Sequence, residues 1–126
     1  MNLLLDTHIL LWWLAGDARL PSMASEAIGT ADNTVTVSAA SAWEIAIKKA
    51  AGRLDAPDDL ADALGANDFE TLAISVAHAL EAGGLPAHHS DPFDRMLIAQ
   101  ARIEHLMLVS VDPRFSDYDV ELLPFP

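Results

Sequence analysis

The sequence predicts an α/β layered domain with a mainly parallel sheet. Two observations lead to this prediction. Strand-like and helix-like segments alternate along the chain, which is typical of a parallel sheet with helices packed against it. The 126 residues are also 52% hydrophobic, a high fraction that suits a sheet buried on both faces. We therefore expect one domain with one core, spanning residues 1–126.

The first half of the chain predicts two strands and three helices. The segment 34–37 is the β-branched run Thr-Val-Thr-Val, which favours a strand. A glycine follows two of the helical segments, at positions 16 and 52, and is expected to end them. The expected strands are 2–5 and 34–37, and the expected helices are 8–15, 21–29 and 38–51.

The second half repeats the alternation. Ser75 is placed to cap a helix, and Asp91-Pro92 is placed to begin another. A loop is expected at 83–86, because Gly-Gly-Leu-Pro favours irregular structure. The expected helices are 58–66, 75–81 and 91–105, and the expected strands are 69–74, 106–111 and 120–123.

Four acidic residues lie at the boundaries of these segments: Asp6, Glu44, Asp94 and Asp112. Asp6 and Asp112 follow strand-like runs, and a ligand site in a parallel sheet lies beyond the carboxyl ends of its strands. Carboxylates gathered there would repel one another unless a divalent cation neutralised them. Mg²⁺ and Mn²⁺ prefer carboxylate ligands, and either can activate a bound water. The pattern therefore predicts a metal-dependent hydrolase.

Each acidic residue also fits a local structural role. Asp6 can cap the helix that follows it, Asp112-Pro113 can begin a turn, and the spacing of Ser41 and Glu44 is that of a capping box. Asp91 lies close to Asp94, and we expect it to be a helix cap rather than a metal ligand. Hydroxyls beside the acids, those of Thr7 and Ser110, can either position a water or phosphate or cap the backbone.

The composition limits the classes of protein. A formal net charge of −12 excludes broad electrostatic binding of nucleic acid, so any such contact must be local and helped by metal. The absence of cysteine excludes disulfides and thiolate metal sites and suggests a cytoplasmic protein. The apolar runs are too short to cross a bilayer, and the N-terminus lacks the basic region of a signal peptide. We therefore expect no association with a membrane.

Other residues invite functional interpretations. His88 and His89 are expected to be solvated loop histidines, because no second cluster of nitrogen ligands supports a zinc site. The three tryptophans, Trp12, Trp13 and Trp43, are expected to pack in the core or against a partner rather than to stack on bases. Arg95 and Arg114 follow two of the acids, and we expect these two arginines to contact phosphate.

The chain resembles the PIN-domain ribonucleases, specifically the VapC-type toxins of VapBC toxin–antitoxin modules. The resemblance spans nearly the whole chain. It is carried by four blocks: LLDTH at 4–8, SAASAWEIAIK at 38–48, DPFDRMLIAQA at 91–101 and VSVDPRF at 109–115. The last block of the family often has threonine two residues before its acid, where this chain has Ser110, so a hydroxyl is kept.

The resemblance implies a three-layer α/β/α sandwich and Mg²⁺- or Mn²⁺-dependent cleavage of RNA, with Asp6, Glu44, Asp94 and Asp112 as the acidic set. It also implies a cognate antitoxin protein and a homodimer. Two alternatives stay open on the residues alone. One is a non-catalytic acidic α/β module that binds a basic partner. The other is a metal-dependent DNA nuclease or phosphatase.

Overall fold

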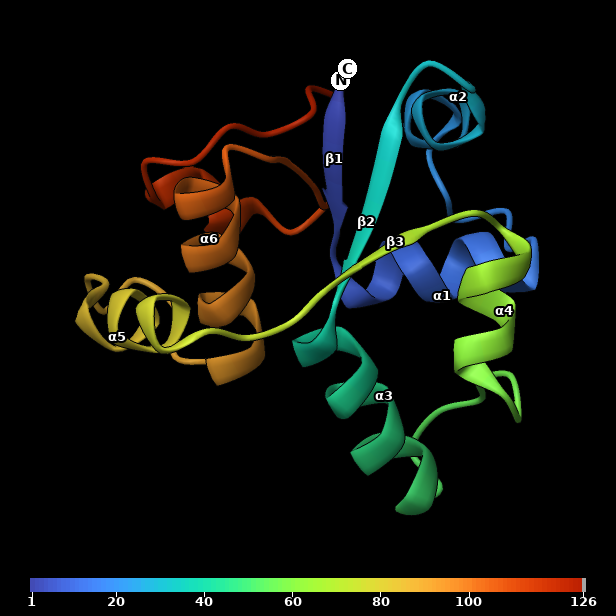
Figure 1. Ribbon diagram of the computed structural model, residues 1–126, viewed down its shortest axis with the longest axis horizontal. Coiled ribbons are helices and arrows are strands. Elements are labelled where there is room, and N and C mark those ends of the chain that lie inside the picture. The colour runs from blue at the N-terminus through green and yellow to red at the C-terminus, as the bar shows by residue number, and fades with distance from the viewer. Residues whose placement is uncertain (126) are drawn as a thin grey trace.

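The fold was obtained as a computed structural model, which describes residues 1–125. The expected domain of residues 1–126 thus includes one residue, Pro126, that lies outside the described part. Four strands form one sheet in the order β3-β2-β1-β4 (Figure 1). All three pairs of neighbouring strands are parallel, which confirms the expected sheet. The strands are β1 (Asn2–Leu5), β2 (Thr34–Ser38), β3 (Glu70–Leu72) and β4 (Met107–Val109).

Six α-helices and one 3-10 helix connect and cover the strands in the described residues. Gly16 ends the first helix in the left-handed conformation, with φ of 62°, as its position predicts. Asp91 caps the last α-helix by accepting hydrogen bonds from two backbone N–H groups. The helices are α1 (Thr7–Ala15), α2 (Ser22–Gly29), α3 (Ala39–Ala50), α4 (Leu60–Ala66), α5 (Val76–Gly84), α6 (Pro92–Glu104) and the 3-10 helix η1 (Pro113–Asp117).

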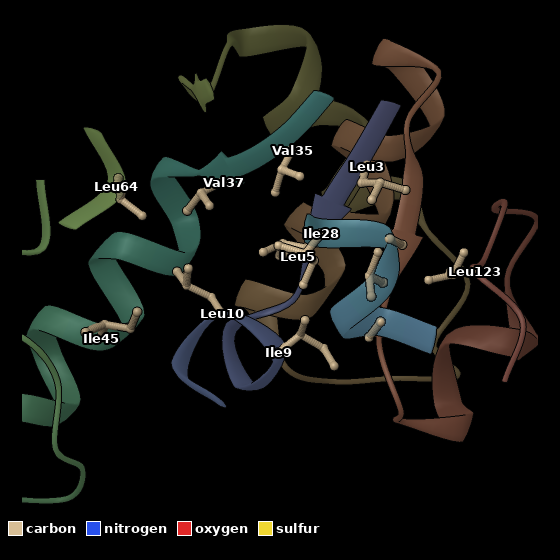
Figure 2. Close-up of a cluster of buried hydrophobic side chains, with 13 residues drawn as sticks. Leu3, Leu5, Ile9, Leu10, Ile28, Val35, Val37, Ile45, Leu64 and Leu123 are labelled. Carbon is tan, nitrogen blue, oxygen red and sulfur yellow. The ribbon is translucent and has the colours of Figure 1, made fainter. Parts of the chain in front are cut away.

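Successive residues of β1 point to opposite faces of the sheet and anchor two separate cores. Leu3 and Leu5 pack with apolar residues of α1 and α2, and Figure 2 shows this cluster with Ile9, Leu10 and Ile28 around them. Leu4 packs on the other face, with residues of α6 and β4. Burying each leucine contributes about 1.5–3 kcal/mol. Helices on both faces, visible on either side of β1 in Figure 1, confirm the α/β/α sandwich.

Some element boundaries differ from the predictions. The last expected strand, 120–123, is wrong: only a single bridge joins Leu122 to Leu108, and Pro124 soon follows. The expected loop at 83–86 is partly wrong, because Gly83 and Gly84 form the end of α5. Packing of α5 against α6 outweighs the roughly 1 kcal/mol that each glycine costs a helix. Strands β3 and β4 are shorter than the expected 69–74 and 106–111.

The helices of residues 1–125 are at most 13 residues long, whereas a helix that crosses a bilayer needs roughly 20. In residues 1–125, none combines the length and the apolar character that a membrane-spanning helix needs.

Candidate metal centre

The topology of the sheet places two of the acidic segments side by side. Strand β1 has β2 on one side and β4 on the other, so the chain changes direction across the sheet at the β1–β4 pair. Ligands bind at such a point, beyond the carboxyl ends of the strands. Leu5 pairs with Val109 in the parallel register, and the backbone N–H of Asp6 donates to the Val109 carbonyl at 3.0 Å. Asp6 and Ser110 therefore leave the sheet as neighbours.

Ser110 links Asp6 to Asp112. Its hydroxyl donates a short hydrogen bond to the Asp6 carboxylate. The backbone N–H of Asp112 donates to the same hydroxyl oxygen at 3.0 Å. Asp6 is buried and also accepts a hydrogen bond of 2.8 Å from the Ile9 N–H, so it caps α1 as well. The structural and functional interpretations of Asp6 are thus compatible.

Asp94 approaches this cluster from the first turn of α6. Asp91, the N-cap residue, accepts hydrogen bonds from the N–H groups of Phe93 at 2.8 Å and Asp94 at 3.1 Å. These bonds account for Asp91 as a cap, as expected. They also orient the first turn of the helix, in which Asp94 projects toward the ends of β1 and β4.

His89 is the member of the centre that the sequence did not indicate. Its Nε2 lies 2.7 Å from Asp94 Oδ2 and 4.0 Å from Asp112 Oδ2. The ligand atoms of His89, Asp94 and Asp112 all lie within 4.8 Å of one another. The expectation of a solvated loop histidine is therefore wrong for His89, which is only 3% exposed, although it holds for the exposed His88. The available sequence signal was the position of His89, two residues before the helix-starting pair Asp91-Pro92.

The position of His89 is fixed from several sides. Its backbone N–H donates to the Tyr118 hydroxyl at 2.8 Å, and its ring packs edge-on against Phe115 at a centroid distance of 6.0 Å. The Asp91 N–H donates weakly to Nδ1, at 3.4 Å. Because Nδ1 is an acceptor, the proton of the neutral ring lies on Nε2 and is donated to Asp94. His89 thus orients the carboxylate of Asp94.

Arg95 supports the loop that carries His89. Its guanidinium donates to the carbonyls of Ala82, Leu85, Pro86 and His89 at 2.8–3.1 Å. These four bonds use the donors that a phosphate would need. The contacts favour a structural role for Arg95, in place of the expected contact with phosphate.

The charges of the cluster are not balanced. Burial raises the pKa of Asp6, and burial together with the nearby Asp91 carboxylate raises the pKa of Asp94 to about 6. Asp112 differs, because hydrogen bonds from Arg114 lower the pKa of its carboxyl group. Asp6 has no ion-pair partner among residues 1–125. Two of the three aspartates therefore lack full compensation of their charge.

Glu44 lies beside this cluster in a separate network. The Thr7 hydroxyl donates to Glu44 Oε1 at 2.6 Å, and the Lys48 ammonium lies 2.6 Å from Glu44 Oε2. Ser38, rather than Ser41, caps α3, so the capping-box interpretation of Glu44 is wrong. Glu44 is buried one turn into the helix, and Thr7, the neighbour of Asp6, joins it to the metal centre.

The donor set fits a hard divalent cation. The carboxylates of Asp94 and Asp112 lie with His89 in one cluster, and Ser110 joins the Asp6 carboxylate to it. The pKa values of Asp6 and Asp94 are raised. Oxygen ligands suit Mg²⁺ and Mn²⁺, whereas the chain has no thiolate for softer metals. The residues that could hold such a cation are Asp94, Asp112 and His89, with Asp6 joined to them through Ser110.

The chain is similar to known proteins in sequence and in fold. The sequence is similar to that of Ribonuclease VapC22 of Mycobacterium tuberculosis, with 35% identity over 121 residues that cover 93% of this chain and 92% of the relative. The fold is similar to VapBC2 of Rickettsia felis bound to a promoter DNA fragment, with a TM-score of 0.68, 16% identity and 98% of each chain covered. A toxin–antitoxin complex from Klebsiella pneumoniae has a TM-score of 0.69, 18% identity and 97% of each chain covered.

A sequence model described as the PIN domain matches residues 3–121. This match includes the ends of β1 and β4, the loop with His89 and the start of α6, which together form the candidate metal centre. The chain therefore belongs to the PIN domain family.

Proposed function

We propose that the chain is a Mg²⁺- or Mn²⁺-dependent endoribonuclease, acting as the toxin of a toxin–antitoxin pair. The observation that carries this proposal is the cluster of His89, Asp94 and Asp112 at the carboxyl ends of a PIN-domain sheet, to which Ser110 joins Asp6. The similarity to Ribonuclease VapC22 supports RNA as the substrate.

Some of these residues would hold the cation, and others orient the residues that hold it. Asp6, Asp94 and Asp112 would hold the cation, which when bound would lower the pKa of a water and stabilise charge on the phosphodiester. Ser110 orients Asp6, and His89 orients Asp94. Glu44 has both oxygens bonded to Thr7 and Lys48, so it would orient water or substrate from the second network rather than bind the cation directly.

Cleavage of RNA tests the proposal. The purified protein should cut single-stranded RNA with Mn²⁺ or Mg²⁺ and stop when EDTA is added. Asp94→Asn should lower the rate by at least about 10²–10³-fold, a loss typical of removing one transition-state stabilising group. Asp32→Asn is the matched control, since Asp32 is exposed and outside the cluster. Equal cleavage by both variants, or cleavage of DNA in preference to RNA, would contradict the proposal.

A homodimer is also part of the proposal, and the distribution of exposed apolar side chains supports it. Trp12 and Trp13 are half-buried and pack against the main core. Exposed apolar side chains instead lie on α3 and α5, where Trp43 is 61% exposed and Val76 and Leu80 are 76% and 73% exposed. Pairing of such residues would bury them. Trp43→Ser with Leu80→Ser should give a monomer by light scattering, whereas Val111→Ser, on another exposed apolar residue, should not.

The antitoxin would act at the acidic cluster. The similar folds from Rickettsia felis and Klebsiella pneumoniae come from toxin–antitoxin complexes. A basic side chain from the partner would be attracted to Asp6 and Asp94, whose charges are uncompensated. Antitoxin and cation should therefore compete, and Mn²⁺ should bind more weakly to the complex than to the free chain in calorimetry. Equal affinities would show that inhibition acts elsewhere.

A further inference from the structure

A hollow lined in part by Glu44 opens on the surface of the protein. It lies between α1 and the C-terminal half of α3, helices that pack together in Figure 1, and has a volume of about 540 Å³. We call it the α1–α3 pocket. Thr7 and Glu44 line it, and the same two residues connect to Asp6 and the metal centre. The pocket therefore adjoins the candidate metal centre through Thr7, the neighbour of Asp6.

The basic residues of the chain gather at this pocket. Three of its seven, Arg19, Lys48 and Arg53, are in the lining. Three acids also line it, so the pocket is neutral and the net charge of −12 lies on the rest of the chain. Arg53 is exposed, and its guanidinium has no hydrogen bond or ion pair within residues 1–125.

The other four basic residues are engaged elsewhere. Arg95 donates to four carbonyls, and Arg114 pairs with Asp112. Lys49 pairs with Asp58, and Arg102 pairs with Glu81. The lining of the α1–α3 pocket has three basic and three acidic residues, so it repels a polyanion less than the acidic remainder of the chain does. Arg53 is the cation best placed to contact a phosphate.

Aromatic rings line the same pocket. His8 is exposed, and its ring lies 6.2 Å from that of Trp12 between centroids, at an angle of 52°. The Arg19 guanidinium lies over Trp12, with Cζ 5.3 Å from the ring centroid. Rings of this kind, beside guanidinium groups, are the platforms on which bases of single-stranded nucleic acids stack. The free guanidinium of Arg53 and the aromatic rings therefore line the same pocket as Glu44.

We propose that the α1–α3 pocket binds a nucleotide of single-stranded RNA next to the cleaved bond, with Arg53 on its phosphate and Trp12 and His8 on its base. The inference rests on the proposed ribonuclease function and extends it, because it assigns a substrate subsite outside the metal centre. In this inference Arg53 contacts the phosphate, in place of the expected Arg95 and Arg114.

Arg53→Ala provides the first test, with Arg102→Ala as its matched control. Both remove one exposed arginine, but Arg102 lies on α6 and pairs with Glu81. The probe is a fluorescently labelled single-stranded RNA of randomised sequence, measured by anisotropy in EDTA so that it is not cut. Arg53→Ala should weaken binding and lower the slope of log Kd against log salt by about 0.7, the value for one phosphate contact. Arg102→Ala should leave the slope unchanged.

The second test substitutes Trp12, whose ring is proposed to stack on the base. Trp12 packs against the core, so the variants are Trp12→Phe and Trp12→Leu, which keep apolar bulk. Loss of base stacking should weaken RNA binding roughly tenfold in Trp12→Leu, and Trp12→Phe should recover most of it. Circular dichroism and thermal melting would verify that both variants fold.

The outcomes separate the inference from the function on which it rests. In cleavage assays with Mn²⁺, Arg53→Ala should raise KM and leave kcat nearly unchanged, whereas Asp94→Asn should lower kcat. If Asp94→Asn is inactive but Arg53→Ala and Trp12→Leu bind and cleave RNA like Arg102→Ala, the pocket assignment is overturned and the ribonuclease function stands. If the unmodified protein neither binds nor cuts RNA, both are overturned.

Discussion

Asp6 and Glu44 are equally buried, each at 4% exposure, yet they lie in opposite electrostatic surroundings. Glu44 has a lysine ammonium 2.6 Å from one oxygen and a threonine hydroxyl 2.6 Å from the other. Among residues 1–125, the donors to Asp6 are a hydroxyl and a backbone N–H, and burial raises the pKa of its carboxyl group. Burial alone therefore does not define a metal ligand. At Glu44 the fold supplies a lysine ammonium, whereas no Lys, Arg or His of residues 1–125 lies within ion-pair distance of Asp6.

The pH dependence of stability should show the largest contrast. The pKa of Asp94 rises from 3.8 to about 6 on folding, so between these values the folded state binds more protons than the unfolded state. The free energy of unfolding, without metal, should fall as pH rises through this window. Each pKa unit corresponds to about 1.4 kcal/mol, and solvent screens a partly exposed carboxylate, so the fall should lie between about 1 and 3 kcal/mol.

Urea unfolding in EDTA at a series of pH values measures this slope. Asp94→Asn should remove most of it and should stabilise the metal-free protein at neutral pH. Asp112→Asn should keep the slope, because Arg114 lowers the pKa of Asp112 instead of raising it. Equal slopes for Asp94→Asn and the unmodified chain would show that Asp94 is not the group whose pKa rises on folding.

His89 should be the most important positioning residue of the metal centre. His89→Asn keeps a polar side chain but cannot reach Asp94 in the same way, so the carboxylate loses its 2.7 Å partner. Loss of such an orienting bond typically weakens metal binding by about 10–100-fold. Calorimetric titration with Mn²⁺ would measure it. His88→Asn, at the exposed neighbouring position, should leave the affinity unchanged.

Thr7 tests the second network through stability. Thr7→Val keeps the shape of the side chain but removes the hydroxyl that donates to Glu44 at 2.6 Å. A buried carboxylate oxygen that loses its donor should destabilise the fold by about 1–3 kcal/mol. Thr34→Val, at the exposed start of β2, serves as the control and should change the free energy of unfolding little. If both substitutions change the free energy of unfolding to a similar extent, the Thr7–Glu44 hydrogen bond does not stabilise the fold.

Glu44→Gln should have the smallest effect on the cation. Glutamine still accepts from Thr7, and Lys48 already compensates the charge that is removed. We expect the Mn²⁺ affinity to change by less than about threefold, an energy below 1 kcal/mol. A loss as large as that of Asp94→Asn would make Glu44 a direct ligand and would unite the two networks into one site.

The sequence by itself determined the order of elements, the parallel sheet and the positions of the acids. Apolar runs, β-branched residues and glycine stops are local signals, and they located β1, β2, α1, α2 and α3 within one or two residues. Asp6 and Asp112 could be assigned to strand ends for the same reason. The last expected strand failed because its pairing depends on the distant β4, not on its own residues.

Only the tertiary structure decided how the polar residues sort into two networks. His89 joined Asp94 because Tyr118 and Phe115, from a later part of the chain, fix the loop that carries it. Asp6 and Thr7 are adjacent in sequence, yet Asp6 bonds to Ser110 and Thr7 bonds to Glu44. Hydrogen bonds between residues 37 or 104 positions apart depend on how helices pack on the sheet, and no local pattern records that packing.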